Sequence, residues 1–88
     1  GSWALKSNAE SGVGYADIRL EIPATKTGCV IEVKYAENGD YGKTLTRAME
    51  QIEKNRYAEV LKQNGMETIY QYGIACYKKN CRVSCRLA

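Results

Sequence analysis

The chain of 88 residues contains no histidine. Serine and cysteine nucleophiles that rely on a histidine base are therefore excluded as a source of hydrolytic activity. No apolar run approaches the roughly 20 residues that span a bilayer, and no signal-peptide pattern is present. We therefore expect no membrane association and a cytoplasmic location. Metal chemistry is the catalytic class that the composition leaves open.

The four cysteines lack the spacing of a zinc site. Cys29, Cys76, Cys81 and Cys85 include no C-x-x-C pair, and the missing histidines remove the other common zinc ligand. We therefore expect reduced thiols packed within a cytosolic domain.

The length predicts one small domain, which buries roughly 60 to 65% of the surface of its unfolded chain. Thirteen basic and ten acidic residues give a formal net charge of +3, which permits a polyanionic partner without requiring one. Gly1-Ser2 has the form of a cloning scar. We interpret residues 3–88 as one domain and as a fragment of a longer chain.

The hydrophobic pattern predicts three strands, one broken helix and two further strands. We expect strands over 3–7, 15–22 and 29–35, a loop over 8–14, a helix over 43–64, and strands over 67–77 and 81–87. One helix between two strands predicts a right-handed crossover that joins parallel neighbours. The predicted fold class is α/β (α+β), with a mixed central sheet of about five strands: a three-strand meander, the broken helix and a two-strand hairpin.

The helix carries two apolar stripes that do not align. The first ends at Ile52 and the second begins at Tyr57, five residues later. This step rotates the apolar face by about 140°, which predicts a bend near Lys54-Asn55. Gly65 is a residue suited to end the helix.

Two ionisable residues lie in the strand predicted to be central. Period-two alternation places Glu32 and Lys34 on the face that also carries Val30. Burying such groups costs several kcal/mol unless they are paired, solvated or bound to a cation. Asp17 begins the preceding strand, and if the two strands pair, Asp17 and Glu32 could hold a hard divalent cation. The alternative is an exposed pair on a half-open face, which the apolar Val30 beside it disfavours.

The spacing of Asp17 and Glu32-Val33-Lys34 resembles the PD-(D/E)XK phosphodiesterase superfamily. Further segments resemble the nuclease-like domain at the C-terminus of uncharacterised bacterial AAA-ATPase-like proteins: 6–8, 10–12, Gly14, 51–52, 57–58 and 72–75. The resemblance implies a restriction-endonuclease-like core. Two departures are Ala16, where the family has proline, and the missing leading helix.

The resemblance implies a metal-dependent nuclease. Asp17, Glu32 and the Val33 carbonyl would hold Mg²⁺ (or Mn²⁺), and Lys34 would assist the attacking water. Gln51 would orient substrate or the lysine. Tyr57 is interpreted equally as a site residue and as a core aromatic. Accessory positions near the phosphate are Ser7, Glu10 and Ser11, although a loop glutamate is usually only solvated.

The implied partner is nucleic acid, with DNA favoured. The alternatives are a catalytically inactive nucleic-acid- or partner-binding accessory domain of an ATPase, and a purely structural accessory domain. The sheet is expected to have two apolar faces, and one broken helix can cover only one of them. The other face then needs a partner. We expect a homodimer formed through that face, or helix halves that fold back across both faces.

Overall fold

The computed structural model describes the backbone of residues 4–10 and 15–88 and the side chains of residues 16–88. The strands are β1 (Ala4–Glu10), β2 (Tyr15–Ile22), β3 (Thr27–Tyr35), β4 (Thr68–Tyr77) and β5 (Asn80–Leu87). The helices are α1 (Tyr41–Lys54) and α2 (Tyr57–Gln63), and two short 3₁₀ turns, Pro23–Thr25 and Glu37–Gly39, precede β3 and α1. Residues 1–3, which include the expected cloning scar, lie outside the described part.

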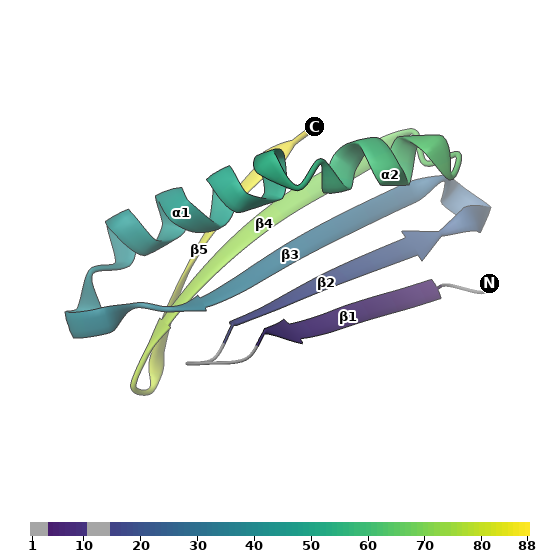
Figure 1. Ribbon diagram of the computed structural model, residues 1–88. Coiled ribbons are helices and arrows are strands. Elements are labelled where there is room, and N and C mark those ends of the chain that lie inside the picture. The colour runs from purple at the N-terminus through teal and green to yellow at the C-terminus, as the bar shows by residue number, and fades with distance from the viewer. Residues whose placement is uncertain (1–3, 11–14) are drawn as a thin grey trace.

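The strands form one mixed sheet in the order β1-β2-β3-β4-β5 (Figure 1). Neighbours pair antiparallel except β3 and β4, which are parallel and are joined through the two helices. The predicted α+β mixed sheet is confirmed, as is the parallel pairing of the strands on either side of the helices. Strand β3, which carries Glu32 and Lys34, lies between β2 and β4.

Three predicted boundaries are wrong by two residues or more. Strand β3 begins at Thr27 rather than at residue 29, because Thr27 and Gly28 already pair with β2. Strand β1 continues through Glu10, so residues 8–10 belong to a strand that pairs with β2 rather than to a loop. Helix α1 begins at Tyr41, two residues before the predicted start, because the Asp40 side chain accepts a hydrogen bond from the Lys43 amide at 3.2 Å and caps the first turn. The C-terminal prediction agrees with the structure, since Gly65 follows the helix with a positive φ of 93°.

The helix breaks where its apolar stripe rotates. Arg56 adopts a left-handed conformation with φ 55°, between the end of α1 and the start of α2. This break re-aims the second stripe, so that Leu61 of α2 joins Ile52 of α1 in one core cluster over the sheet residues Val30 and Ile69. Both helices therefore cover the same face of the sheet (Figure 1). The expectation that the helix halves fold back across both faces is wrong.

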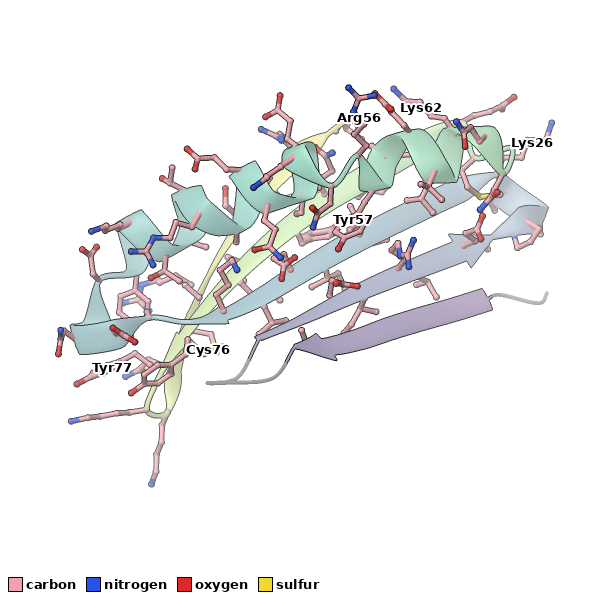
Figure 2. The ribbon with its side chains drawn as sticks, in the orientation of Figure 1. Lys26, Arg56, Tyr57, Lys62, Cys76 and Tyr77 are labelled. Atoms are coloured by element: carbon pink, nitrogen blue, oxygen red, sulfur yellow. The ribbon has the colours of Figure 1, made fainter. Side chains whose placement is uncertain are left out.

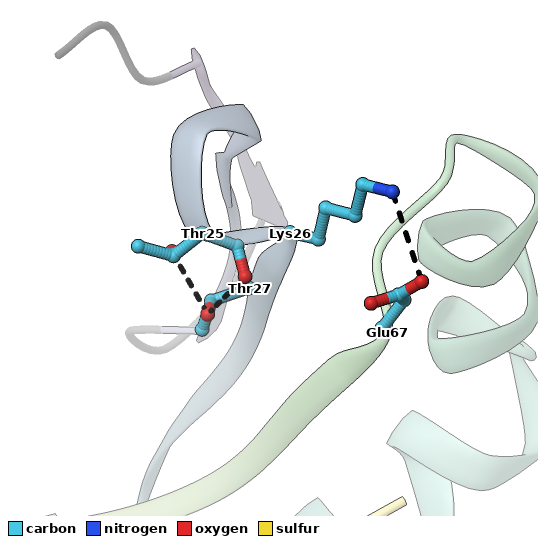
Figure 3. A network of polar contacts seen from close by, with 4 residues as sticks. All are labelled: Thr25, Lys26, Thr27 and Glu67. Carbon is cyan, nitrogen blue, oxygen red and sulfur yellow. Dashed lines mark hydrogen bonds and ion pairs between the residues drawn. The ribbon is translucent and has the colours of Figure 1, made fainter.

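The turn between β2 and β3 is tied to the start of β4. Lys26 accepts main-chain hydrogen bonds from Glu67 at 2.7 Å and Thr68 at 3.1 Å, and its ammonium forms an exposed ion pair with Glu67 at 3.8 Å (Figure 3). The Thr25 hydroxyl donates to the Thr27 hydroxyl within the same turn. These contacts lie beside the Thr27 and Thr68 pair, which begins the β3–β4 ladder. They favour the register that aligns Glu32 with Gly73.

The second face of the sheet is apolar, and no helix of the described part of the chain lies on it (Figure 1). It is called the open face below, and the register places on it the alternate described residues of each strand. They are Ala16, Ile18, Leu20, Ile22, Thr27, Cys29, Ile31, Val33, Tyr35, Thr68, Tyr70, Tyr72, Ile74, Cys76, Cys81, Val83, Cys85 and Leu87. Val83 and Leu87 on β5 are 59% and 65% exposed.

The cysteines are less buried than the sequence suggested. Cys29 and Cys76 are half-buried, but Cys81 and Cys85 are exposed because they lie on the edge strand β5. Cys76 and Cys81 are direct cross-strand partners, and their Sγ atoms lie 2.7 Å apart in a shared hydrogen bond. This bond, together with burial, raises the pKa of Cys76 to about 11, so Cys76 stays protonated at neutral pH.

Candidate functional site

The buried acidic pair of the site comes from two adjacent strands. Asp17 of β2 and Glu32 of β3 are directly opposite in the antiparallel register, on the face that the helices cover. Asp17 is 1% exposed and Glu32 is 0% exposed, and both Glu32 carboxylate oxygens are enclosed. Directly opposed side chains have Cβ atoms about 5 Å apart. Two carboxylates this close in a water-poor setting repel each other when charged, which favours a cation between them.

Lys34 lies on the same face two residues further along β3. Its ammonium donates a hydrogen bond to the Gln51 side-chain oxygen at 2.6 Å, which links the central strand to helix α1. The side chain of Lys34 is 8% exposed. The interpretation of Glu32 and Lys34 as an exposed cross-sheet pair is therefore wrong, because α1 covers this face.

Gly73 allows the helix to approach the sheet at this level. It is the β4 partner of Glu32 in the register, and a Cβ at this position would lie 3.0 Å from Met49 Sδ and 3.2 Å from Ala48 Cβ. Met49 could relieve the first contact by changing rotamer, but Ala48 Cβ has no rotamer to change, so a larger residue would require α1 to shift by a few tenths of an ångström there. A displaced α1 would carry Gln51 away from Lys34.

Tyr57 reaches the acidic pair from the start of α2. Its hydroxyl donates to Asp17 Oδ2 at 2.9 Å and accepts from the Asn55 amide at 3.0 Å. Figure 2 shows Tyr57 pointing from the helix break towards the sheet, whereas Arg56 and Lys62 point away from it. Burial, and then the bond to Asp17, raise the pKa of Tyr57, which keeps the phenol protonated as a donor.

Arg19 adds a positive charge beside this tyrosine. Its guanidinium carbon lies 5.2 Å from the centre of the Tyr57 ring, from the position on β2 that follows Asp17 on the same face. Such cation–π contacts contribute about 0.5 to 1 kcal/mol at partly exposed sites. Tyr57 is thus both a packed aromatic and a partner of Asp17, so the two interpretations of this residue are compatible.

The donor set suits a hard divalent cation, with one condition. Asp17 and Glu32 offer carboxylate oxygens, which Mg²⁺ and Mn²⁺ prefer. Among the residues that the structure describes, no group of three or more Cys, Asp and Glu side chains is placed to hold a metal. A cation at this pair would therefore need main-chain or water oxygens as well, and the Val33 carbonyl follows Glu32 directly in the chain.

The side chains of the accessory positions lie outside the described part of the chain. Glu10 pairs with Tyr15 in the β1–β2 ladder, and Ser7 pairs with Ile18, but their side chains are not among those described. Ser11 lies outside the described residues. The Val33 side chain is on the open face, so only its main chain could serve the site.

A pocket of about 550 Å³ lies at the exposed side of Lys34. It is lined by Lys34, Arg47, Glu50, Gln51, Lys54 and Asn55. The sequence interpretation missed Arg47, Lys54, Glu50 and Asn55. The signal for the first two was their spacing around Gln51 at i−4 and i+3, which puts all three on one side of a helix.

Comparisons with known proteins assign the family. The family model of the PD-(D/E)XK nuclease superfamily matches residues 2–85, which is nearly the whole chain. No curated protein matches the chain, and no solved structure does either. None of the helices in the described part is long and apolar enough to span a membrane. The match agrees with the mixed sheet and with the acidic pair and lysine on its central strands, and the chain belongs to the PD-(D/E)XK nuclease superfamily.

Proposed function

We propose that this domain is a nuclease that hydrolyses phosphodiester bonds with the help of Mg²⁺ or Mn²⁺. The observation that carries the proposal is the burial of Asp17, Glu32 and Lys34 on one face of the sheet, with Gln51 bonded to the lysine. Membership of a family that generally contains phosphodiesterases supports it. Three buried ionisable groups are costly to a small domain, and a catalytic site is a physical reason to keep them.

Asp17, Glu32 and the Val33 carbonyl would hold the metal ion. When bound, the ion polarises the phosphate and makes water a better nucleophile. Lys34 orients the attacking water or stabilises the negative charge that develops on the phosphate. Gln51 accepts a 2.6 Å hydrogen bond from the Lys34 ammonium. This bond holds the lysine side chain in one conformation. Tyr57 holds Asp17 in position through its 2.9 Å bond.

One observation favours the second candidate, a domain that binds nucleic acid or a partner without cutting. The acidic pair is almost fully buried, and the Asn55–Tyr57 hydrogen bond lies over Asp17. Such a domain could serve as an accessory part of an ATPase-like chain. The two candidates differ in metal dependence, because cleavage requires the ion and electrostatic binding to phosphates does not.

A cleavage assay separates these candidates. Single-stranded and double-stranded DNA and RNA are incubated with the protein in Mg²⁺, in Mn²⁺ and in EDTA. We expect cleavage only with metal, and we expect Lys34→Ala to lower it by at least about 100-fold, as losses of one charge-stabilising group do. The matched control is Lys62→Ala, which removes the same charge from an exposed position on α2.

Circular dichroism and thermal melting must show that Lys34→Ala is folded. Cleavage by folded Lys34→Ala at the parent rate would contradict the assigned role of the lysine. No cleavage of any substrate by the parent protein would favour the binding domain.

A further inference from the structure

We propose that Arg47 and Lys54 of α1 form a binding track for the phosphates on either side of the one at Lys34, so that the 550 Å³ pocket receives the backbone of a nucleic-acid strand. The inference rests on the proposed function, because it takes Lys34 as the position of the reacting phosphate. It adds the surface that holds the rest of the strand.

The geometry of α1 supports such a track. Arg47, Gln51 and Lys54 line the same pocket as Lys34, and Gln51 lies between the other two along the helix. Seven residues at a rise of 1.5 Å separate Arg47 from Lys54 by about 10 Å along the helix axis. One strand of a duplex advances about 3.4 Å along the duplex axis per phosphate, so two long side chains about 10 Å apart can reach phosphates that are two or three steps apart. A phosphate at Lys34 would thus have a cation near each neighbouring part of the strand.

Arg47 and Lys54 have no carboxylate partner in the described part of the chain, unlike Lys26, Arg56 and Arg86. In the described part of the chain, ion pairs engage Lys26 with Glu67, Arg56 with Glu59, and Arg86 with Glu53. No carboxylate of that part lies within ion-pair distance of Arg47 or Lys54. Both side chains are exposed, and an external anion could therefore bind them without first breaking an ion pair.

Glu50 allows the effect of a negative charge on phosphate binding to be tested in the same pocket. It is the one acidic side chain among the residues that line the pocket, against three cationic ones. A phosphate in the pocket is attracted by Arg47 and Lys54 and repelled by Glu50. Removing the negative charge should therefore strengthen binding, whereas removing either positive charge should weaken it.

The experiment measures binding without cleavage. Fluorescein-labelled single-stranded and duplex DNA of about 20 nucleotides is titrated in EDTA at several salt concentrations, using Asp17→Asn as the background protein. This background removes one negative charge and one proposed metal ligand. The DNA is therefore not cleaved during the titration, and the signal reports binding alone. Variants in this background are Arg47→Ala with Lys54→Ala, Glu50→Gln, and the control Lys62→Ala.

We expect the double variant to bind more weakly and to lose about 0.7 to 0.9 from the slope of log K against log salt for each phosphate contact removed. Glu50→Gln should bind more tightly, and Lys62→Ala should leave the slope unchanged. A double variant that binds like its background would overturn the track. An equal loss per charge in Lys62→Ala would also overturn it, since net charge alone would then explain the effect. If the double variant binds more weakly but the Lys34→Ala variant of the parent cleaves at the parent rate, the binding track is supported and the catalytic role of Lys34 is contradicted.

Discussion

The two faces of the sheet differ in where they carry ionisable groups, because the face under the helices buries three of them beside the apolar core. The face under the helices buries Asp17, Glu32 and Lys34 at 8% exposure or less, whereas the open face is apolar and only half-buried. Ionisable side chains usually lie at the protein surface. Buried ionisable groups are typical of functional sites, and an exposed apolar face is typical of a contact surface, so the two faces call for different tests.

The largest expected effect tests the covered face. A metal ion between Asp17 and Glu32 would replace their repulsion by attraction, and a ligand at ten times its Kd stabilises the folded state by about 1.4 kcal/mol. We therefore expect Mg²⁺ or Mn²⁺ to raise the Tm by several degrees, measured by thermal melting over a metal series.

Two variants sharpen this measurement. Asp17→Asn keeps the side-chain shape but removes a ligand charge, and it should lose most of the rise in Tm. Glu67→Gln removes a charge from an exposed position and should keep the rise. If both variants respond like the parent, the ion binds elsewhere and the acidic pair is not the metal site.

A smaller effect is expected from Tyr57, which closes the covered face over Asp17. Tyr57→Phe removes the donated hydrogen bond to Asp17 and the bond accepted from Asn55, while it keeps the ring near Arg19. We expect the free energy of unfolding to fall by about 1 kcal/mol near neutral pH. Urea denaturation of the two proteins measures this difference.

The pH dependence gives this prediction a second readout. The folded-state pKa of Tyr57 is raised above its ordinary value of 10.0, mainly by burial and then by the bond to Asp17. The protonated phenol therefore stabilises the folded protein fully below pH 10.0, and this stabilisation is lost as pH rises through the raised pKa. The gap between the parent and Tyr57→Phe should be constant near neutral pH and should shrink above pH 10.0. A gap that grows above this value would contradict the role of the phenol as a donor.

The order of strands and helices followed from local signals, but the polarity of the faces did not. Alternation showed that Asp17 shares a side with Arg19, and that Glu32 shares one with Lys34. It could not show which side a helix covers, because that depends on how α1 docks across β3 and β4. The step of five residues after Ile52 predicted the helix break correctly.

The contacts within the site were less predictable than the elements that carry it. The Tyr57 contact with Asp17 joins residues forty apart, and it depends on the left-handed conformation of Arg56. Nothing in the local sequence around Arg56 specifies that conformation, since arginine has no special preference for positive φ. The resemblance to the family pointed to Gln51, and the structure adds the 2.6 Å bond to Lys34.

The smallest expected effect on stability tests the open face. Val83 is 59% exposed on edge strand β5, so Val83→Lys should change the free energy of unfolding by no more than about 0.5 kcal/mol. Its effect on association should be larger. The described residues of the open face carry no charged side chain, so two copies can meet through it about a two-fold axis without like-charge repulsion.

We expect the parent protein to approach the mass of a dimer as its concentration rises in sedimentation equilibrium, and we expect Val83→Lys to shift this transition to higher concentration. A two-fold interface would place one new lysine from each copy in an apolar contact. Desolvating these lysines costs free energy that no carboxylate on the described face offsets. Arg82→Ala is the control on the same strand, because Arg82 lies on the helix side with its guanidinium carbon 4.8 Å from the Tyr41 ring centre.

A parent that stays monomeric at every concentration would contradict the second copy as the partner of this face. Equal weakening by Arg82→Ala would instead place the contact on the edge of β5, because that edge is common to both substitutions and the open face is not.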